Sequence, residues 1–264
     1  MSLQATPAAA QPIACGKLYL VPAPLDFGCN EPMNLEDTLP WGTLAVAARL
    51  QYWVCENAKS IRAYLKRVNE IIALRSPMQD LQIQELPREV HKKGDHSGHF
   101  DARHLLSPAL AGHDIGLVSE AGMPAVADPG SSVVRAAHDL GIEVLPLSGA
   151  VSLLLALAAS GLNGQNFAFV GYLPQEPAAR AQRVRELESL ALKTGQTQMF
   201  IETPYRNAAM LQTLLQTLQH NTRLALCSGL TLSRASCRSD SVKNWKQKTS
   251  PLDNATPAVF ALGR

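Results

Sequence analysis

The chain has 264 residues, of which 46% are hydrophobic and 17% charged, and its formal net charge is +2. These are globular values, ample for a sizeable core in one large domain or two of ordinary size. So small a charge neither requires nor excludes nucleic acid as a partner. The five cysteines are scattered and form no Cys-x-x-Cys pair. They support neither a disulfide framework nor a zinc knuckle, and such usage is typical of the reducing cytoplasm.

Targeting signals are not evident in the sequence. The longest apolar run, residues 151–160, is about half the roughly 20 residues that a bilayer requires. Residues 1–11 are rich in Ala, Gln and Pro and lack the charged and apolar regions of a secretory signal. We therefore expect a disordered tail over residues 1–12, a cytoplasmic location and no membrane partner.

Short apolar runs alternate with helical patterns along the chain. Strands are predicted at residues 17–21, 51–55, 114–118, 143–146, 167–171, 198–201, 223–227 and 258–262. Helices are predicted at residues 60–73, 133–140, 151–159, 178–192 and 207–219. In the last helix the apolar residues recur at the i, i+3 and i+4 spacing of one buried face. This alternation predicts an α/β fold with mostly parallel sheets that are covered on both faces.

A turn-rich stretch at residues 161–166 marks the predicted domain boundary. It divides the chain into an N-terminal α/β domain over residues 13–162 and a C-terminal α/β domain over residues 163–264. The polar residues 233–250, rich in Ser and Lys, are expected to form a solvated loop or a short helix.

The most informative segment reads Gly116-Leu-Val-Ser-Glu-Ala-Gly-Met-Pro-Ala-Val-Ala-Asp-Pro-Gly130. Its glycines and prolines dictate the path of the backbone and leave N–H and C=O groups facing outward. A strand that ends in such a turn before a helix is where open α/β proteins bind ligands. The loop after the first strand, which begins at Pro22, should face the same side. The alternative is a purely structural connection between strand and helix.

Several segments, taken in order, resemble the tetrapyrrole-methylase superfamily. They include Leu117–Gly130, Val144-Leu-Pro-Leu-Ser-Gly-Ala-Val-Ser152, Phe169-Val-Gly-Tyr-Leu-Pro174, Phe200-Ile-Glu-Thr-Pro-Tyr-Arg206 and Pro257-Ala-Val-Phe-Ala261. The likeness runs from about residue 18 to residue 262. It is stronger to the branch that methylates a ribose 2′-hydroxyl of 16S ribosomal RNA.

The resemblance implies a class III methyltransferase fold, with S-adenosylmethionine in a trough between two α/β domains. It also implies a homodimer that acts on ribosomal RNA or the small subunit. The cofactor-binding positions that it implies are Pro22, Gly122, Met123, Val126, Ser148, Gly149, Ala150, Val151, Ser152, Ile201, Glu202, Ser228 and Ala258. Small residues at the start of the predicted helix at 151–159 would let a carboxylate approach its N–H groups. Ser148 or Ser152 could equally be an ordinary helix cap.

Methyl transfer from a sulfonium depends on alignment of the reacting atoms and requires no metal. A ribose hydroxyl would also need a base. The candidate catalytic residues are Glu56 and Lys59, after the second predicted strand, although they could also form a solvated pair of little energetic weight.

Three loops depart from the RNA-methylating branch. Ala23-Pro-Leu-Asp-Phe27 stands where that branch usually carries Thr-Pro-Ile-Gly-Asn. Glu56-Asn-Ala-Lys59 stands in place of Glu-Asp-Thr-Arg, and Ser228-Gly-Leu-Thr231 in place of Arg-Glu-Leu-Thr. Two alternatives therefore stay open. One is methylation of a tetrapyrrole or another small molecule, and the other is a non-catalytic cofactor-binding homologue.

Other polar segments have weaker signals. Residues 91–104 hold four histidines and two aspartates, but their spacing matches no familiar metal signature. A mobile surface loop is favoured there over contacts with the acceptor or RNA and over a metal site. On the predicted helix at 178–192 and its start, arginines and glutamates (Arg180, Arg183, Arg185, Glu176, Glu186 and Glu188) favour a mixed exposed face. Tyr205 and Arg206 could anchor a nucleic acid or pack against the turn at Pro204.

Overall fold

The computed structural model describes residues 14–26, 29, 33–93, 95, 100–248 and 254–264, without the side chains of 91–93. The chain divides into two compact units. The first contains the chain up to Ala23 together with Pro40–Ser148, and the second contains Pro24–Leu39 and Gly149–Arg264. The tail expected over residues 1–12 lies outside the described residues. The domain boundary expected after residue 162 stays a prediction.

A five-stranded parallel sheet forms the centre of the first unit. Its strands are β1 (Leu18–Leu20), β2 (Tyr52–Cys55), β3 (Gln82–Glu85), β4 (Ile115–Val118) and β5 (Val144–Pro146). They lie in the order β3-β2-β4-β1-β5, and all pairs are parallel. The parallel sheet expected for this part of the chain is confirmed. In a parallel sheet the carboxyl ends of all strands meet at one edge, which is where ligands bind.

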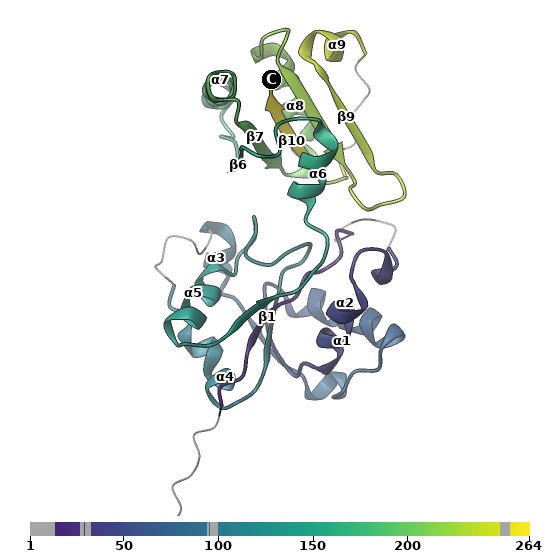
Figure 1. Cartoon of the computed structure of the whole chain (residues 1–264), viewed down its shortest axis with the longest axis vertical. Coiled ribbons are helices and arrows are strands. Elements are labelled where there is room, and N and C mark those ends of the chain that lie inside the picture. The colour runs from purple at the N-terminus through teal and green to yellow at the C-terminus, as the bar shows by residue number, and fades with distance from the viewer. Residues whose placement is uncertain (1–13, 27–28, 30–32, 94, 96–99, 249–253) are drawn as a thin grey trace, which may run out of the picture. The chain divides into compact units, whose positions relative to one another are not determined.

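Helices cover both faces of this sheet. They are α1 (Trp41–Arg49), α2 (Ala58–Ile71), α3 (Arg88–Lys93), α4 (Ser107–Leu110) and α5 (Ser131–Asp139). In Figure 1, α1 and α2 lie on one side of β1, and α3, α4 and α5 lie on the other. Val133 and Ala137 of α5 pack with Ile115 and Leu117 of β4 in one buried cluster. Because both faces are covered, β1, β2 and β4 are apolar throughout rather than alternating, whereas the edge strand β3 is mostly polar.

The second unit has a mixed five-stranded sheet. Its strands are β6 (Phe167–Tyr172), β7 (Thr197–Glu202), β8 (Arg223–Ser228), β9 (Ser236–Ser241) and β10 (Ala258–Gly263). They lie in the order β6-β7-β10-β8-β9, and only the β6–β7 pair is parallel. The expectation of a mostly parallel sheet is wrong here. The last strand, β10, inserts between β7 and β8 and runs antiparallel to both, and β9 returns directly beside β8, so neither pairing needs a crossover helix.

Successive apolar side chains of β7, β8 and β10 alternate between the two faces of this sheet, and each face is covered by a helical layer. One layer is α6 (Ser152–Ser160), and the other contains α7 (Pro177–Thr194), α8 (Asn207–Thr217) and α9 (Val242–Gln247). The α6 helix packs against Met199, Ala225, Cys227, Val259 and Ala261. The other layer packs against Phe200, Leu224, Leu226, Phe260 and Leu262. Both faces are therefore buried, which explains the continuous apolar runs in β7, β8 and β10.

Some elements were not anticipated from the sequence. The strands β3 and β9 and the helices α1, α3 and α4 were missed, whereas α9 fits the short helix expected within residues 233–250. Single turns of 3-10 helix occur at Leu35–Asp37, Met78–Asp80, Arg103–Leu106 and Pro204–Arg206. Among the helices of the described residues, none is long and apolar enough to cross a bilayer.

Candidate functional site

The loop after β1 and the turn after β4 are joined at the carboxyl edge of the first sheet. Ala23 and Gly122 form an isolated antiparallel bridge. The N–H of Ala23 donates to the carbonyl of Gly122 at 2.9 Å, and the reverse hydrogen bond measures 3.0 Å. The buried Pro22 directly precedes this bridge. The expectation that both loops face the same side of the sheet is confirmed.

The β4–α5 turn, residues 119–130, has an unusual concentration of left-handed backbone. Gly122 has φ 70° and Gly130 has φ 135°, while Ala125 and Ala127 have φ 63° and 65°. A non-glycine residue held in that region costs of order 1–3 kcal/mol. Such strain persists only where the surroundings enforce it, and it gathers at functional sites. Of the other predicted residues here, Met123 is half-buried and Val126 is 41% exposed.

Three carboxylates interact at the same sheet edge. Glu56 follows β2, Glu120 follows β4, and Asp128 lies in the β4–α5 turn. Burial, followed by repulsion from Glu56 and Glu120, raises the pKa of Asp128 to about 7. Ser60 Oγ donates to Glu120 Oε1 at 2.7 Å, whereas Lys59 is exposed in the first turn of α2. A carboxyl that titrates near neutral pH is suited to accept a proton from an acceptor hydroxyl.

The polar segment at 91–104 is not a plain surface loop in the part that is described. Asp95 is only 4% exposed, and it binds the start of α5. His96, Ser97, Gly98 and His99 lie outside the described residues. Within the ranges that the structure covers, no group of three or more His, Cys, Asp or Glu side chains could hold a metal ion.

The start of α6 lacks a side-chain cap. Its N-cap residue is Val151, which provides no capping hydrogen bond, so the alternative of an ordinary serine cap is wrong. Ser148 instead contributes its carbonyl oxygen, which accepts from Thr43 Oγ1 at 2.7 Å. The small residues Gly149 and Ala150 precede the helix. Uncapped N–H groups at a helix start favour an anionic group such as a carboxylate.

Three of the predicted residues of the second unit lie in one row across its sheet. Ala258 of β10 is opposite Glu202 of β7 on one side and opposite Ser228 of β8 on the other. Ile201 is opposite Val259 in the next row. The fold therefore brings these positions together, although they are far apart in the sequence.

Glu202 is the charged centre of this row. Its side chain is fully buried, and Arg206 Nη2 lies 2.5 Å from its Oε1 atom. The N–H and the hydroxyl of Thr203 donate to the same oxygen. Arg206 thus packs against the end of β7, one of the two possibilities left open for it, while Tyr205 is 70% exposed.

Buried polar atoms without partners lie at the end of β7, at the start of α8 and in the loop after β8. In the described part of the chain they include Glu202 Oε2, Arg206 Nε, Asn207 Oδ1 and Thr231 Oγ1. The Nδ2 of Asn207 donates to Thr256 O, and a Cβ on Gly229 would lie 3.1 Å from Thr256 Cγ2, so these loops adjoin. Buried polar groups are rarely left unsatisfied except where a ligand or water binds. Neither Asn207 nor Thr231 was predicted as a site residue, because neither stands in a recognisable motif.

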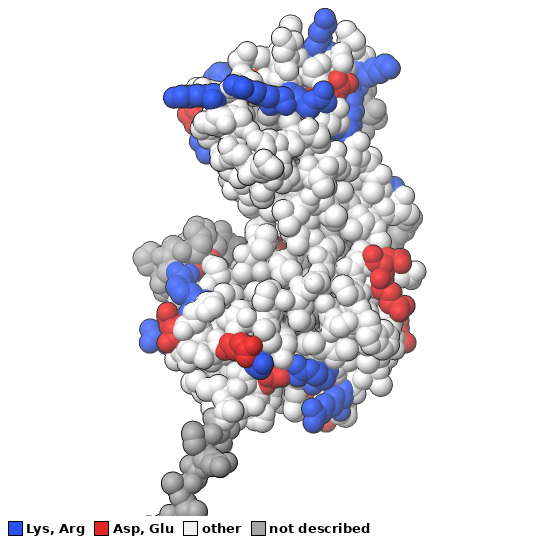
Figure 2. Space-filling view, in the orientation of Figure 1, with Lys and Arg blue, Asp and Glu red and all other residues white. Residues whose placement is uncertain are grey.

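The mixed exposed face expected on α7 is only partly present. Arg180 and Glu188 are 8% and 4% exposed. Arg180 donates to Thr213 Oγ1 and Gln175 O, and Glu188 accepts from Gln219 N and Thr222 Oγ1. Both side chains hold α7 in place rather than meeting solvent. On the visible face of the second unit in Figure 2, basic side chains nevertheless predominate over acidic ones.

Comparison with known proteins places this geometry in a family. The sequence matches Tetrapyrrole (Corrin/Porphyrin) Methylases over residues 47–242. The crystal structure of uroporphyrin-III-C-methyltransferase from Thermus thermophilus is similar with a TM-score of 0.53 and 18% identity, over 94% of each chain. At that identity the likeness concerns the fold alone.

Several curated relatives are named Ribosomal RNA small subunit methyltransferase I. The protein from Halalkalibacterium halodurans is 31% identical over 82% of this chain and 65% of its own length. That from Vibrio cholerae is 36% identical over 52% and 46%, and that from Haemophilus influenzae is 31% identical over 64% and 58%. The chain thus spans less than two thirds of the length of these relatives. With most of its length matched, the chain belongs to the tetrapyrrole (corrin/porphyrin) methylase family.

Proposed function

We propose that this protein is an S-adenosylmethionine-dependent methyltransferase that methylates a ribose 2′-hydroxyl of 16S ribosomal RNA. The observation that carries the proposal is the strained β4–α5 turn at the carboxyl edge of a parallel sheet, in a chain of the methylase family. The names of the curated relatives support ribosomal RNA as the acceptor.

The residues present fit this cofactor. In the first unit, Gly122, Met123 and Val126 offer backbone groups in the β4–α5 turn, next to Pro22. In the second unit, the uncapped start of α6 at Gly149, Ala150, Val151 and Ser152 suits a carboxylate. The unpartnered oxygens of Glu202 and Asn207 suit amino groups, and the cofactor's chemical contribution is an electrophilic methyl group.

Proton transfer from the acceptor falls to the acidic group of the first unit. The carboxyl of Asp128, with Glu56 and Glu120 beside it, can hold a proton near neutral pH. Lys59 is an exposed cation in the first turn of α2, after β2, and suits a phosphate of the acceptor. Basic side chains on the second unit support an RNA substrate (Figure 2).

Isothermal titration with S-adenosylmethionine and S-adenosylhomocysteine tests the cofactor site. We expect micromolar binding, about −8 kcal/mol. Gly122→Val should abolish it, because Gly122 has φ 70° within the turn. Gly141→Val is the matched control, since Gly141 has φ 69° and a Cβ added there would meet nothing within 4 Å, so it carries the same backbone strain away from the turn. Equal loss of binding in both variants would contradict the assignment.

Methyl transfer to unmodified 16S RNA or to small subunits tests the acceptor. Incorporation into a ribose of that RNA is expected. Methyl incorporation only into a uroporphyrinogen-type substrate would show that the acceptor is a small molecule instead of RNA. Cofactor binding without turnover on any acceptor would indicate a non-catalytic homologue. The loss of charged residues from the loop at Ser228 would be consistent with that result.

We also propose a cytoplasmic homodimer. The family resemblance supports the dimer, and the five free cysteines suit a reducing compartment. Light scattering after size exclusion tests the dimer, and a single-chain mass would contradict it.

A further inference from the structure

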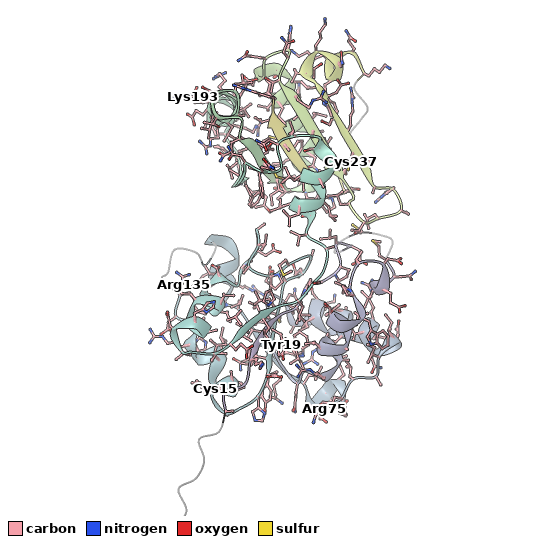
Figure 3. All side chains as sticks on the ribbon, viewed as in Figure 1. Cys15, Tyr19, Arg75, Arg135, Lys193 and Cys237 are labelled. Atoms are coloured by element: carbon pink, nitrogen blue, oxygen red, sulfur yellow. The ribbon has the colours of Figure 1, made fainter. Side chains whose placement is uncertain are left out.

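Asp95 is a buried carboxylate outside every residue set assigned above. Its Oδ2 atom accepts from Gly130 N at 2.9 Å, Ser132 N at 2.8 Å and Ser132 Oγ at 2.6 Å. Its Oδ1 atom accepts from Ser131 Oγ at 2.7 Å. Arg135, labelled in Figure 3, donates from Nη2 to the Asp95 carbonyl oxygen at 3.2 Å. The carboxylate therefore binds the residues at which the β4–α5 turn becomes helix.

This contact replaces a local helix cap. The N-cap residue of α5 is Gly130, which has no side chain to cap the helix. A carboxylate at a helix N-terminus satisfies free N–H groups and interacts favourably with the helix dipole. Burial opposes ionisation of Asp95, but the hydrogen bonds from Ser132, Ser131 and Gly130 outweigh it and lower the pKa of Asp95. Asp95 is thus held as the anion.

The turn that ends at Gly130 needs such support because it is strained. Ala125 and Ala127 are left-handed, and each costs of order 1–3 kcal/mol in that conformation. Within the turn, Ala125 N donates to Pro129 O at a long 3.3 Å. The start of the turn is fixed by the bridge to Ala23. Its end is fixed by Asp95.

We propose that Asp95 is a positioning residue, whose carboxylate holds the β4–α5 turn in the conformation that binds the cofactor. The inference rests on the proposed function, because the β4–α5 turn has a ligand to bind only if the protein uses S-adenosylmethionine. The proposed role also explains why an acidic residue lies within the polar segment at residues 91–104, whose sequence suggested a loop or a metal site.

The test compares Asp95→Asn with Asp101→Asn in the full chain. Asp101 is an exposed carboxylate of the same segment whose Oδ1 atom accepts from Arg103 N and Nε, and among the described hydrogen bonds it makes none to α5. S-adenosylhomocysteine affinity is measured by titration, and hydrogen exchange is measured on peptides covering residues 119–130. Asp95→Asn should weaken binding at least tenfold and speed exchange in that turn, and Asp101→Asn should change neither. Binding within twofold of wild type in Asp95→Asn would overturn the inference.

A milder variant covers the case in which Asp95→Asn does not fold. Ser132→Ala removes one hydrogen bond to Asp95 Oδ2 and keeps the carboxylate. It should weaken binding about threefold to tenfold, less than the full effect of a hydrogen bond to a charged group, because Gly130 N, Ser131 Oγ and Ser132 N still donate to the carboxylate; unchanged affinity would count against the role.

Relief of strain separates positioning from general stability. If Asp95 acts by holding left-handed alanines, adding Ala125→Gly and Ala127→Gly to Asp95→Asn should recover part of the lost affinity. A merely structural role predicts that the glycines recover stability without recovering affinity, because glycine relieves left-handed strain whether or not the turn binds the cofactor. If the wild-type protein binds neither ligand, the proposed function fails, while faster exchange of the turn in Asp95→Asn still reports the structural contact by itself.

Discussion

Gly116 in the middle of β4 offers a direct test of the packing in the first unit. It lies opposite Trp53 in the β2–β4 register. A Cβ at Gly116 would lie 2.5 Å from both Cε3 and Cζ3 of Trp53 and 3.1 Å from Leu50 Cδ1. The indole is 1% exposed, and its Nε1 donates to Leu50 O at 3.3 Å. A rigid, hydrogen-bonded ring cannot move aside as the end of a flexible side chain would.

The expected loss from Gly116→Ala is large for one methyl group. Overpacking of a core costs about 1–3 kcal/mol, and the contact with a buried ring places this variant near the upper limit. In a chain of this size about 3 kcal/mol corresponds to a fall in Tm of roughly 6–12 °C. Gly42→Ala in α1 should act in the opposite direction, because a Cβ added at Gly42 would meet nothing within 4 Å. It should stabilise by about 0.5–1 kcal/mol through helix propensity.

Urea unfolding followed by circular dichroism would measure both effects. The same Gly→Ala change should give opposite signs at the two positions. Adding Trp53→Phe to Gly116→Ala should cost less than the sum of the separate losses, because the smaller ring makes room for the methyl group. A Gly116→Ala protein within about 0.5 kcal/mol of wild type, the range of ordinary surface substitutions, would refute the packing argument.

Three further outcomes follow from buried charges and thiols. Arg206→Met leaves the buried Glu202 carboxylate without its cation and should lower the free energy of unfolding in urea by about 3–5 kcal/mol. Adding Glu202→Gln should recover part of this loss. Full additivity of the two changes would contradict an interaction between Arg206 and Glu202. Because the folded pKa of Asp128 is raised to about 7, its contribution to stability is present below about pH 4, near the unfolded value, and is lost as the pH rises through 7. Asp128→Asn should therefore gain stability relative to wild type between pH 4 and 8, roughly the range set by those two values, and a constant difference would exclude that pKa. Burial raises the pKa of the Cys227 thiol to about 12, so brief alkylation at about pH 8 should label the exposed Cys237 and spare Cys227, as peptide mass spectrometry would show.

The sequence predicted the structure correctly where a local pattern of residues determines the path of the backbone. The β4–α5 turn is an example, since its glycines and prolines mark the strand end, the corner and the start of α5 in a row. The parallel first sheet follows likewise from alternating strands and helices. The position of Pro22 at the same sheet edge required only the rule that loops after parallel strands share an edge.

The sequence did not predict the structure where the conformation or role of a residue depends on a partner distant in the chain. The residues of β9, Ser236–Ser241, have no apolar alternation, and the strand forms because β8 offers backbone hydrogen bonds. The direction of β10 depends on its insertion between β7 and β8, which an apolar run cannot encode. Asp95 binds a helix start 35 to 37 residues away, so no local motif reveals its role.

The division of the chain between the two units has a consequence for biosynthesis. The polypeptide passes from one unit to the other after Ala23, after Leu39 and after Ser148. Pro24–Leu39 is therefore made long before the rest of its own unit, Gly149–Arg264, leaves the ribosome. Domains made from one continuous stretch can fold in order of synthesis, at about 5–20 residues per second. Here Pro24–Leu39 cannot complete its packing until residues of Gly149–Arg264 have emerged, and no single cut releases the second unit intact.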